Sequence, residues 1–426
     1  MKREKLALYG GHKSINYKIE KYNSIGKEEL KAAQKVIKSG ILSDFIGKDG
    51  KKFLGGKNVI NFENKIKNYF KVKYAVVVNS WTSGLIAAFG SIGIKPGDEV
   101  ILPTWTMSAC AMAIINWNAI PVFVDIERNT FNIDPNLIEK KISKKTKAIL
   151  AVDIFGHPAN YKKIFIIAKK YNLKVISDSA QSIGSKYNKK FSGTFADIGG
   201  FSLNCHKHIN TGEGGILLTN NKNIAYKLKL IRNHAESSIN LNKPPKKELI
   251  NMIGYNFRLG EIESAIGIEQ LKKLKKIVNL RKKFANLLTK GLSNLEGLKL
   301  PIIEKNCSHS FYTYPIILNT KKIKLSRKTI CKALKAEGVQ VSEGYVNLHI
   351  LPMFKNKIAY GDSGFPWILN KSKNYNYKKG SCPVAEKLHE KTFMHIGMYT
   401  LDYRIKDIKK IINAFQKVWR NIEILK

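Results

Sequence analysis

The stretch Asn204–Gly215, Asn-Cys-His-Lys-His-Ile-Asn-Thr-Gly-Glu-Gly-Gly, places Lys207 on a glycine-rich turn. An apolar run upstream, Leu173–Ser177, predicts a buried strand that is followed by Asp178, 29 residues before Lys207. Neither residue is informative alone, because lysine is abundant in this chain. The ordered pair, an aspartate at a strand end and then a lysine on a confined turn, indicates a specific chemistry.

That chemistry is the chemistry of pyridoxal phosphate. The amine of Lys207 can form a Schiff base with the cofactor aldehyde, and the carboxylate of Asp178 can keep the pyridine nitrogen protonated so that the ring accepts electrons. A lysine near a cationic ring and out of water has a lowered pKa, which supplies the free amine. The other interpretation of Asp178 is a helix cap, a common use of aspartate.

Further motifs make the chain similar to the DegT-like sugar aminotransferases, a branch of the fold-type I pyridoxal phosphate enzymes. The matching segments are Asp178-Ser179-Ala180-Gln181, Phe201-Ser202 with Lys207 in register, Thr211–Gly215, Gly254-Tyr255-Asn256-Phe257-Arg258 and Pro383-Val384-Ala385-Glu386. The resemblance runs from about residue 10 to 425 in the family's order. The resemblance therefore covers nearly the whole chain.

Between residues 74 and 233, short β-rich runs alternate with helical runs, which predicts an α/β fold with a mostly parallel sheet covered by helices. The expected strands are Tyr74–Asn79, Glu99–Pro103, Ile120–Asp125, Thr146–Asp153, Leu173–Ser177, Gly199–Leu203 and Gly215–Thr219. Helices are expected over 134–142 and 161–171. The resemblance implies a seven-stranded sheet of the fold-type I class, and such sheets bind ligands at the carboxyl ends of their strands.

We expect residues 1–258 to form an N-terminal segment and the large cofactor-binding domain, and residues 259–426 to form a smaller α+β domain. The latter begins with a long helix over 259–292 and contains a strand over 312–318. Its last helix carries a packing stripe of Ile408, Ile411, Ile412, Phe415, Val418, Trp419 and Ile422. Two glycine-rich stretches, 42–59 and 360–380, are candidate lids or binding loops, with surface insertions as the alternative.

The formal net charge of +42 raises the alternative of a basic nucleic-acid-binding protein. However, only 8 of the 74 basic residues are arginine, which leaves 66 lysines, and these occur along the whole chain. Base-reading and bidentate phosphate sites favour arginine, so the composition argues against nucleic acid as a partner. A weak steering field for a doubly anionic nucleotide sugar is compatible with this charge.

Other compositional features are those of a globular protein. Hydrophobic residues make up 44% of the chain, and no apolar run approaches the ~18 residues of a membrane span. The N-terminus has no apolar stretch behind its basic residues, which argues against a secretory signal. The five cysteines form no Cys-x-x-Cys pair, so we expect free thiols in a reducing cytoplasm and no metal site.

The resemblance implies further cofactor contacts. Gln181 would contact the phenolic oxygen, with a solvated helix position as its alternative. Thr82 and Ser83 follow the first strand where a helix opens, so their hydroxyls and backbone N–H groups are candidates for the phosphate, with helix capping as the alternative. Ser202 is a further hydroxyl candidate. The family usually has glycine where Trp81 stands, so this turn needs ordinary backbone angles or a wider path.

Two contacts are less closely determined. The family's stacking aromatic aligns with Met107, whose thioether can contact a ring face. Trp105 is a possible substitute, and a core role is open for both. Asn256 resembles the position that reaches the phosphate from a neighbouring subunit, which implies a homodimer with shared active sites. A local turn role is the alternative for Asn256.

The function implied is transfer of an amino group from an amino acid, glutamate, to a keto sugar, most simply a nucleotide-linked one, in polysaccharide or glycan synthesis. One branch of the family carries histidine at the position of Lys207 and dehydrates its sugar, so the lysine favours transamination. His206 and His208 receive no role. The alternatives are a keto-sugar dehydratase, a keto-cyclitol aminotransferase, and a regulatory or nucleic-acid-binding protein on this fold.

Overall fold

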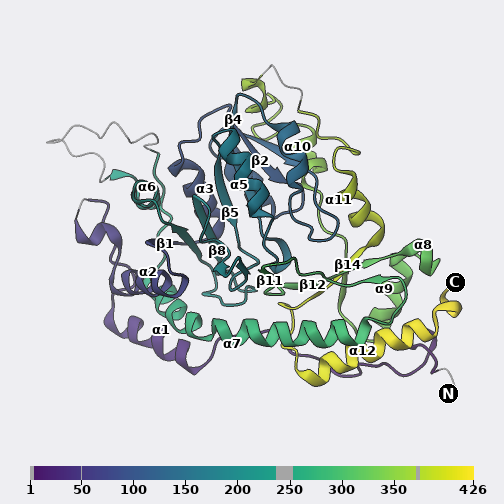
Figure 1. Ribbon diagram of the computed structural model, residues 1–426. Coiled ribbons are helices and arrows are strands. Elements are labelled where there is room, and N and C mark those ends of the chain that lie inside the picture. The colour runs from purple at the N-terminus through teal and green to yellow at the C-terminus, as the bar shows by residue number, and fades with distance from the viewer. Residues whose placement is uncertain (1–3, 49, 237–252, 371–374) are drawn as a thin grey trace.

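A computed structural model describes residues 4–48, 50–236, 253–370 and 375–426. Figure 1 shows a large part built around a central sheet and a smaller part to one side, with the long helix α7 (Glu261–Leu292) running beneath both. Among the described residues, no helix is both long and apolar enough to cross a membrane.

The large part contains a seven-stranded sheet in the order β1-β9-β8-β5-β4-β2-β3. Its strands are β1 (Tyr74–Val78), β2 (Glu99–Pro103), β3 (Ile120–Val124), β4 (Thr146–Val152), β5 (Lys174–Asp178), β8 (Ile198–Ser202) and β9 (Gly215–Thr219). Four neighbouring pairs are parallel, and β9 runs opposite to the other six strands. The predicted mostly parallel seven-stranded sheet is confirmed, and each predicted strand lies within one residue of an observed one at either end.

Helices cover both faces because the strands are apolar on both sides. On one face, α2 (Lys57–Phe70) and α7 enclose a cluster with β1, β8 and β9. On the other face lie α3 (Trp81–Ser91), α4 (Ser108–Ile115) and α6 (Lys222–Arg232). α5 (Tyr161–Lys170) lies on the same face as α2 and α7, because the Tyr161 hydroxyl contacts Ser177 of β5, whereas the next residue, Asp178, faces α3 and α4. The helices predicted over 161–171 and 259–292 are confirmed as α5 and α7.

The helix predicted over 134–142 is wrong. The segment instead forms two short 3-10 turns, η3 (Pro135–Leu137) and η4 (Glu139–Lys141). Within these residues Ile138 is the fully buried large side chain, while its neighbours Glu139 and Lys140 are exposed. Leu137 and Ile142 pack half-buried against the same cluster, so short turns at both ends of the segment place its apolar residues without a continuous helix.

The smaller part is an antiparallel sheet covered by helices. Its strand order is β10-β12-β14-β13, formed by β10 (Leu298–Lys299), β12 (Thr313–Leu318), β14 (Phe393–Gly397) and β13 (Val341–Glu343). The helices are α9 (Arg327–Ala336) and α12 (Ile405–Arg420), and the predicted stripe of α12 packs into this core. Leu6 and Ile15 from the N-terminal segment join the same cluster. A domain boundary at 258/259 stays a prediction.

Part of the stretch 360–380 crosses back to the large sheet; its residues 371–374 lie outside the described residues. Tyr375 donates a hydrogen bond to Glu99 Oε1 at 2.6 Å, and Tyr377 donates to the Pro121 carbonyl at 2.6 Å. Glu99 begins β2, and Pro121 is the second residue of β3. This stretch therefore packs against the amino edge of the sheet, the edge opposite to the one where ligands bind such folds.

The stretch 42–59 is tied down beside β1; its residue 49 lies outside the described residues. Glu261, the first residue of α7, accepts hydrogen bonds from the backbone N–H groups of Asn58 and Val59 at the start of α2. The Asn233 side chain donates to the carbonyls of Ile46 and Phe53. These hydrogen bonds hold the stretch against the start of α7 and the end of α6.

Candidate active site

The predicted site residues follow strands that end at one edge of the large sheet. Because β9 runs opposite to both neighbours, the other six strands point the same way and their carboxyl ends share that edge. Asp178 ends β5, Ser202 ends β8, and Ser80 and Trp81 follow β1. The topology thus gathers segments that are far apart in the sequence.

Asp178 is buried and held from three directions. Its Oδ1 accepts hydrogen bonds from the indole N–H of Trp81 at 2.8 Å and from the backbone N–H of Ala180 at 3.0 Å. Its Oδ2 accepts one from the Cys110 thiol at 3.0 Å. Burial, and then the nearby Asp178 charge, raise the pKa of the Cys110 thiol well above its usual value, so the thiol remains a donor.

This arrangement fits the ring nitrogen of pyridoxal phosphate. A carboxylate offers about four lone-pair positions. Among the described residues three donors reach Asp178, so one position is available for a further N–H donor. The predictions from sequence did not include Trp81 or Cys110 as partners of Asp178; the departure from glycine at Trp81 was the available signal for one of them.

Lys207 is half-buried on its turn, and its Nζ lies 4.8 Å from the centre of the Tyr312 ring. Removal of water from the ammonium group lowers the pKa of Lys207 to about 8, while the charge of Asp178 acts in the opposite direction. Tyr312 in turn stacks on Tyr399, with ring centres 4.3 Å apart. The amine is therefore held against an aromatic face and is partly neutral near neutral pH.

The two histidines beside Lys207 differ in their surroundings. His208 is buried, its Nε2 lies 2.9 Å from the Ser310 carbonyl oxygen, and burial lowers its pKa well below the usual value. His206 is exposed, with its Nδ1 3.4 Å from the Cys205 sulfur. His208 thus connects the lysine turn to the chain that leads into β12.

The glycine-rich turn brings the lysine segment against the start of α3. Gly214 has a positive φ of 156°, and a Cβ on Gly215 would lie only 2.6 Å from the Ser80 carbonyl oxygen. A side chain at Gly215 would push α3 away. This close approach explains the need for glycine at that position.

The start of α3 offers the elements of a phosphate site. Ser80 is the N-cap residue: its Oγ accepts a hydrogen bond from the Ser83 backbone N–H at 3.0 Å and lies 2.9 Å from Ser83 Oγ. Trp81 is the first helical residue, so it has ordinary backbone angles as predicted. Thr82 is exposed in this first turn. Helix N-termini bind anions through their free N–H groups and the helix dipole.

The other predicted contacts have local partners. Ser202 is buried and accepts a hydrogen bond from the Asn204 backbone N–H at 3.3 Å. Gln181 is half-buried; its Oε1 accepts from the Phe155 backbone N–H at 2.8 Å, and its Nε2 lies 3.4 Å from the Tyr345 hydroxyl. Gln181 therefore supports two neighbouring segments, whereas a solvated helix residue would not. Cofactor contacts by either residue stay predictions.

The two stacking candidates lie in different surroundings. Trp105 is fully buried, donates to Asn347 Oδ1 at 2.7 Å and stacks on Phe131, so it has the core role. Met107 is 64% exposed at the N-cap of α4. Met107 is thus the one of the two whose side chain is accessible to a ligand, and its stacking role stays a prediction.

Asn256 is exposed near the end of β1. Its carbonyl oxygen lies 3.4 Å from the Asn79 side-chain nitrogen, and its Oδ1 accepts a hydrogen bond from Arg258 Nε at 2.7 Å. Asn79 immediately precedes the Ser80 cap. An exposed amide beside the phosphate candidates is compatible with a local turn role and with a contact across a subunit boundary.

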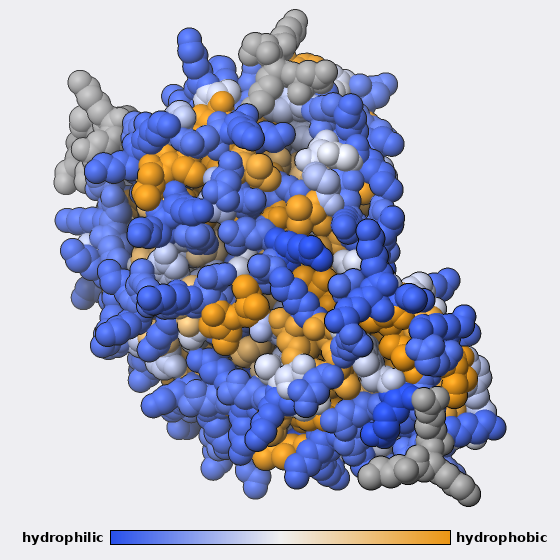
Figure 2. Space-filling model, turned by 45° about the vertical axis from the view of Figure 1, so that its right-hand side comes forward, coloured by the Kyte–Doolittle hydropathy of each residue, from blue (hydrophilic) through white to orange (hydrophobic). Residues whose placement is uncertain are grey.

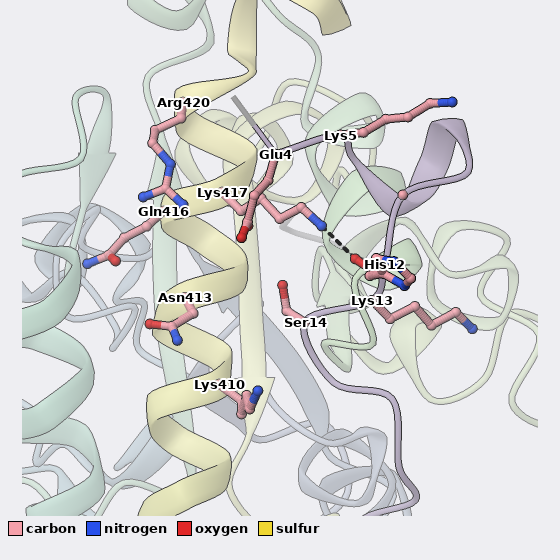
Figure 3. A pocket seen from close by; sticks show the side chains of 11 residues that line it. Glu4, Lys5, His12, Lys13, Ser14, Lys410, Asn413, Gln416, Lys417 and Arg420 are labelled. Atoms are coloured by element: carbon pink, nitrogen blue, oxygen red, sulfur yellow. Dashed lines mark hydrogen bonds between the residues drawn. The ribbon is translucent and has the colours of Figure 1, made fainter. Parts of the chain in front are cut away.

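A separate hollow of about 480 Å³ lies between the N-terminal segment and α12 (Figure 3). It is lined by several basic residues, but Lys5 and Lys13 extend away from α12. Lys417 is buried, and its Nζ donates hydrogen bonds to the His12 carbonyl oxygen at 2.6 Å and to Glu337 Oε2 at 3.1 Å. Its ammonium group therefore already has partners within the protein. Figure 2 shows hydrophilic residues over most of one face of the molecule, with hydrophobic patches among them. Lysine residues occur along the whole sequence and are not confined to this hollow.

Comparisons with known proteins identify the family of the chain. Residues 23–399 match the model of the DegT/DnrJ/EryC1/StrS aminotransferase family. An uncharacterized protein of Methanocaldococcus jannaschii is 33% identical over 399 residues, covering 92% of this chain and 95% of the relative. A GDP-perosamine synthase of Escherichia coli O157:H7 is 33% identical over 302 residues, or 71% of this chain and 80% of the relative. A UDP-4-amino-4,6-dideoxy-N-acetyl-beta-L-altrosamine transaminase of Campylobacter jejuni is 32% identical over 342 residues, or 79% and 86%.

Solved structures share the fold over nearly the whole chain. An aminotransferase from Psychrobacter cryohalolentis superposes with a TM-score of 0.81 at 24% identity and covers 95% of this chain and 100% of its own. Helicobacter pylori PseC, an aminotransferase involved in pseudoaminic acid biosynthesis, has a TM-score of 0.77 at 25% identity, covering 95% and 99%. An E. coli GDP-4-keto-6-deoxy-D-mannose-3-dehydratase with bound hydrated PLP has a TM-score of 0.75 at 26% identity, covering 94% and 99%.

Proposed function

The chain belongs to the DegT/DnrJ/EryC1/StrS aminotransferase family, and from this premise we propose that it transfers an amino group from glutamate to the keto group of a nucleotide-linked sugar. It is a pyridoxal-phosphate-dependent aminotransferase that acts on sugars. The relatives that make GDP-perosamine and a UDP-linked amino sugar support a nucleotide-linked substrate. We place the reaction in cytoplasmic polysaccharide or glycan synthesis, which the free cysteines support.

The observation that carries the choice of transamination is the amine at position 207. When bound, pyridoxal phosphate supplies an electron-accepting ring. Lys207 supplies a nucleophilic amine, and its pKa of about 8 lets it accept and return a proton near neutral pH. Asp178 places a negative charge at the end of β5, and burial strengthens its effect on a cation beside it.

The remaining residues would bind and orient. The N-terminus of α3 with Ser83 and Thr82, together with Ser202, would hold the phosphate. Gln181 and Met107 would contact the ring from its oxygen side and its face. Because all of these side chains lie on or beside strand ends, a rigid sheet sets their spacing.

Product analysis tests the proposed reaction. The purified protein would be incubated with 15N-labelled glutamate and a panel of nucleotide-linked keto sugars and keto cyclitols, and products read by mass spectrometry. We expect a 15N-amino sugar from at least one nucleotide-linked substrate, and none from Lys207→Ala. Loss of water without gain of nitrogen would identify a dehydratase, and amination of cyclitols alone would reject the sugar assignment.

We further propose a homodimer whose two sites are shared, with Asn256 reaching the phosphate of its partner. Lys207→Ala chains mixed with Asn256→Ala chains would then form hybrids that have one intact site and one site lacking both groups. If Asn256→Ala alone is impaired, mixing should restore up to about a quarter of wild-type activity, because about half of the dimers are hybrids. Baseline activity after verified subunit exchange would place Asn256 outside the partner's site.

A further inference from the structure

Trp81 occupies a slot shaped by glycines. Trp81 is 6% exposed, and a Cβ on Gly200 of β8 would lie 2.3 Å from its Cζ3 atom. A Cβ on Gly84, one turn further along α3, would lie 3.0 Å from its Cε3 atom. The ring therefore lies flush against the sheet backbone, where a side chain on Gly200 would not fit.

From this slot the indole nitrogen reaches Asp178. The carboxylate of an aspartate turns freely about its last bond unless hydrogen bonds hold it. Here Trp81 donates from α3 and Cys110 donates from α4, each to a different oxygen, at 2.8 Å and 3.0 Å. Donors on both oxygens, from different elements, determine the plane of the carboxylate.

A third link supports the thiol. Thr106 Oγ1 lies 2.9 Å from the Cys110 sulfur, and both residues are buried. The hydroxyl can donate to the sulfur while the thiol donates to Asp178, which gives the chain Thr106–Cys110–Asp178 one direction of hydrogen bonding. The thiol hydrogen is then directed at the carboxylate.

We propose that Trp81 and Cys110 are positioning residues that orient the Asp178 carboxylate so that its remaining lone pair faces the ring nitrogen of pyridoxal phosphate. The inference rests on the role proposed above for Asp178. Both residues act through the aspartate, and neither needs to touch the cofactor or the substrate for this role. The family usually has glycine where Trp81 stands, and glycine has no side chain that could donate this hydrogen bond to Asp178.

The test compares two ligands that differ only at the ring nitrogen: pyridoxal phosphate and its 1-deaza analogue, which has C–H in that place. Dissociation constants would be measured by absorbance titration of the full-length protein after removal of its cofactor. Trp81→Phe keeps an aromatic ring but removes the N–H donor. We expect it to weaken pyridoxal phosphate binding about tenfold, the effect of one hydrogen bond to a charged group, and to change binding of the analogue less than about twofold.

Trp117→Phe is the matched control. Trp117 is also buried and also donates through its indole nitrogen, to the Ile86 carbonyl at 2.8 Å, so the same atoms are removed away from Asp178. It should leave the ratio of the two dissociation constants unchanged. If Trp81→Phe does not fold, Cys110→Ala carries the test, because it removes the donor to the other oxygen and should change the ratio in the same direction.

Equal weakening of both ligands by Trp81→Phe would mean that Trp81 only fills space, and would overturn the inference. An unchanged ratio in both variants would overturn it as well. A wild-type protein that binds both ligands equally would instead remove the proposed role of Asp178, and the inference with it. None of these outcomes depends on the sugar substrate, so they are independent of the proposed reaction.

Discussion

Asp178 and Glu99 are both buried carboxylates of the same sheet, but they lie at opposite edges. Glu99 begins β2 at the amino edge and accepts hydrogen bonds from Tyr375, Asn370, Ser143 and Thr146, with distances between 2.6 and 3.1 Å. Asp178 ends β5 at the carboxyl edge and accepts three from the described residues. Four donors fill the acceptor positions of a carboxylate, whereas three leave one for a ligand.

The comparison teaches that burial alone does not mark a functional carboxylate. Glu99 joins β2 to the segment before β4 and to the stretch that contains Tyr375, so the partners described above belong to the fold. The three donors described for Asp178 leave one of its acceptor positions open. Asp178 also lies close enough to Lys207 to raise the pKa of that lysine. The two carboxylates differ in how many of their acceptor positions are filled. They also differ because the open position of Asp178 lies near Lys207.

The largest effect is expected for Asp178→Asn. Oδ1 of asparagine can still accept from Trp81 and Ala180, and its amide can donate to the Cys110 sulfur, so the fold should persist. Loss of the negative charge beside the ring nitrogen should lower kcat by about 10²–10⁴. Steady-state kinetics with saturating cofactor measure the loss, and a melting temperature near that of the wild type verifies the fold. Near-normal turnover would show that the ring nitrogen has another partner.

Glu99→Gln should lower stability and leave turnover nearly unchanged, which is the reverse of the effect expected for Asp178→Asn. Four hydrogen bonds to a charged acceptor become bonds to a neutral amide, and one edge of the group changes from acceptor to donor. We expect the free energy of unfolding to fall by about 1–3 kcal/mol, with turnover per folded molecule within about twofold of the wild type. Thermal melting and active-site titration measure the two quantities. A large loss of turnover in a well-folded Glu99→Gln protein would break the distinction between the two edges.

The smallest effect is a shift in pH dependence. The rate at which cofactor-free protein captures pyridoxal phosphate should rise with pH and level off above about pH 8, because only the neutral amine of Lys207 reacts and its pKa is about 8. Since the charge of Asp178 raises that pKa, the midpoint should move to lower pH in Asp178→Asn and stay in place in Glu99→Gln.

Stopped-flow absorbance measures the capture rate, and Lys207→Ala provides the background from other lysines. A midpoint near 10, the usual value for an exposed lysine, would mean that the amine is solvated in the cofactor-free protein. A shift of equal size in both carboxylate variants would show that the effect is a general one of net charge.

Local patterns predicted most of the fold. Short, largely apolar runs identified all seven strands of the large sheet, because a strand buried on both faces has apolar side chains at most positions. The 3.6-residue stripe identified α12 for a similar reason. Residues 134–142 failed because their pattern is too short to distinguish a helix from two turns, and the distinction depends on packing against neighbours far along the chain.

The sequence by itself determined the strands, the pairing of Asp178 with a later Lys207 on a glycine-rich turn, and through its motifs the family and the cofactor. These properties are local, since each depends on residue types within one segment or on the order of segments. The tertiary structure alone decided that Trp105 is in the core while Met107 is accessible, and that part of 360–380 lies at the amino edge. It also decided which donors hold each carboxylate. The Trp81–Asp178 bond joins residues 97 apart and the Tyr375–Glu99 bond joins residues 276 apart, and only the fold sets such distances.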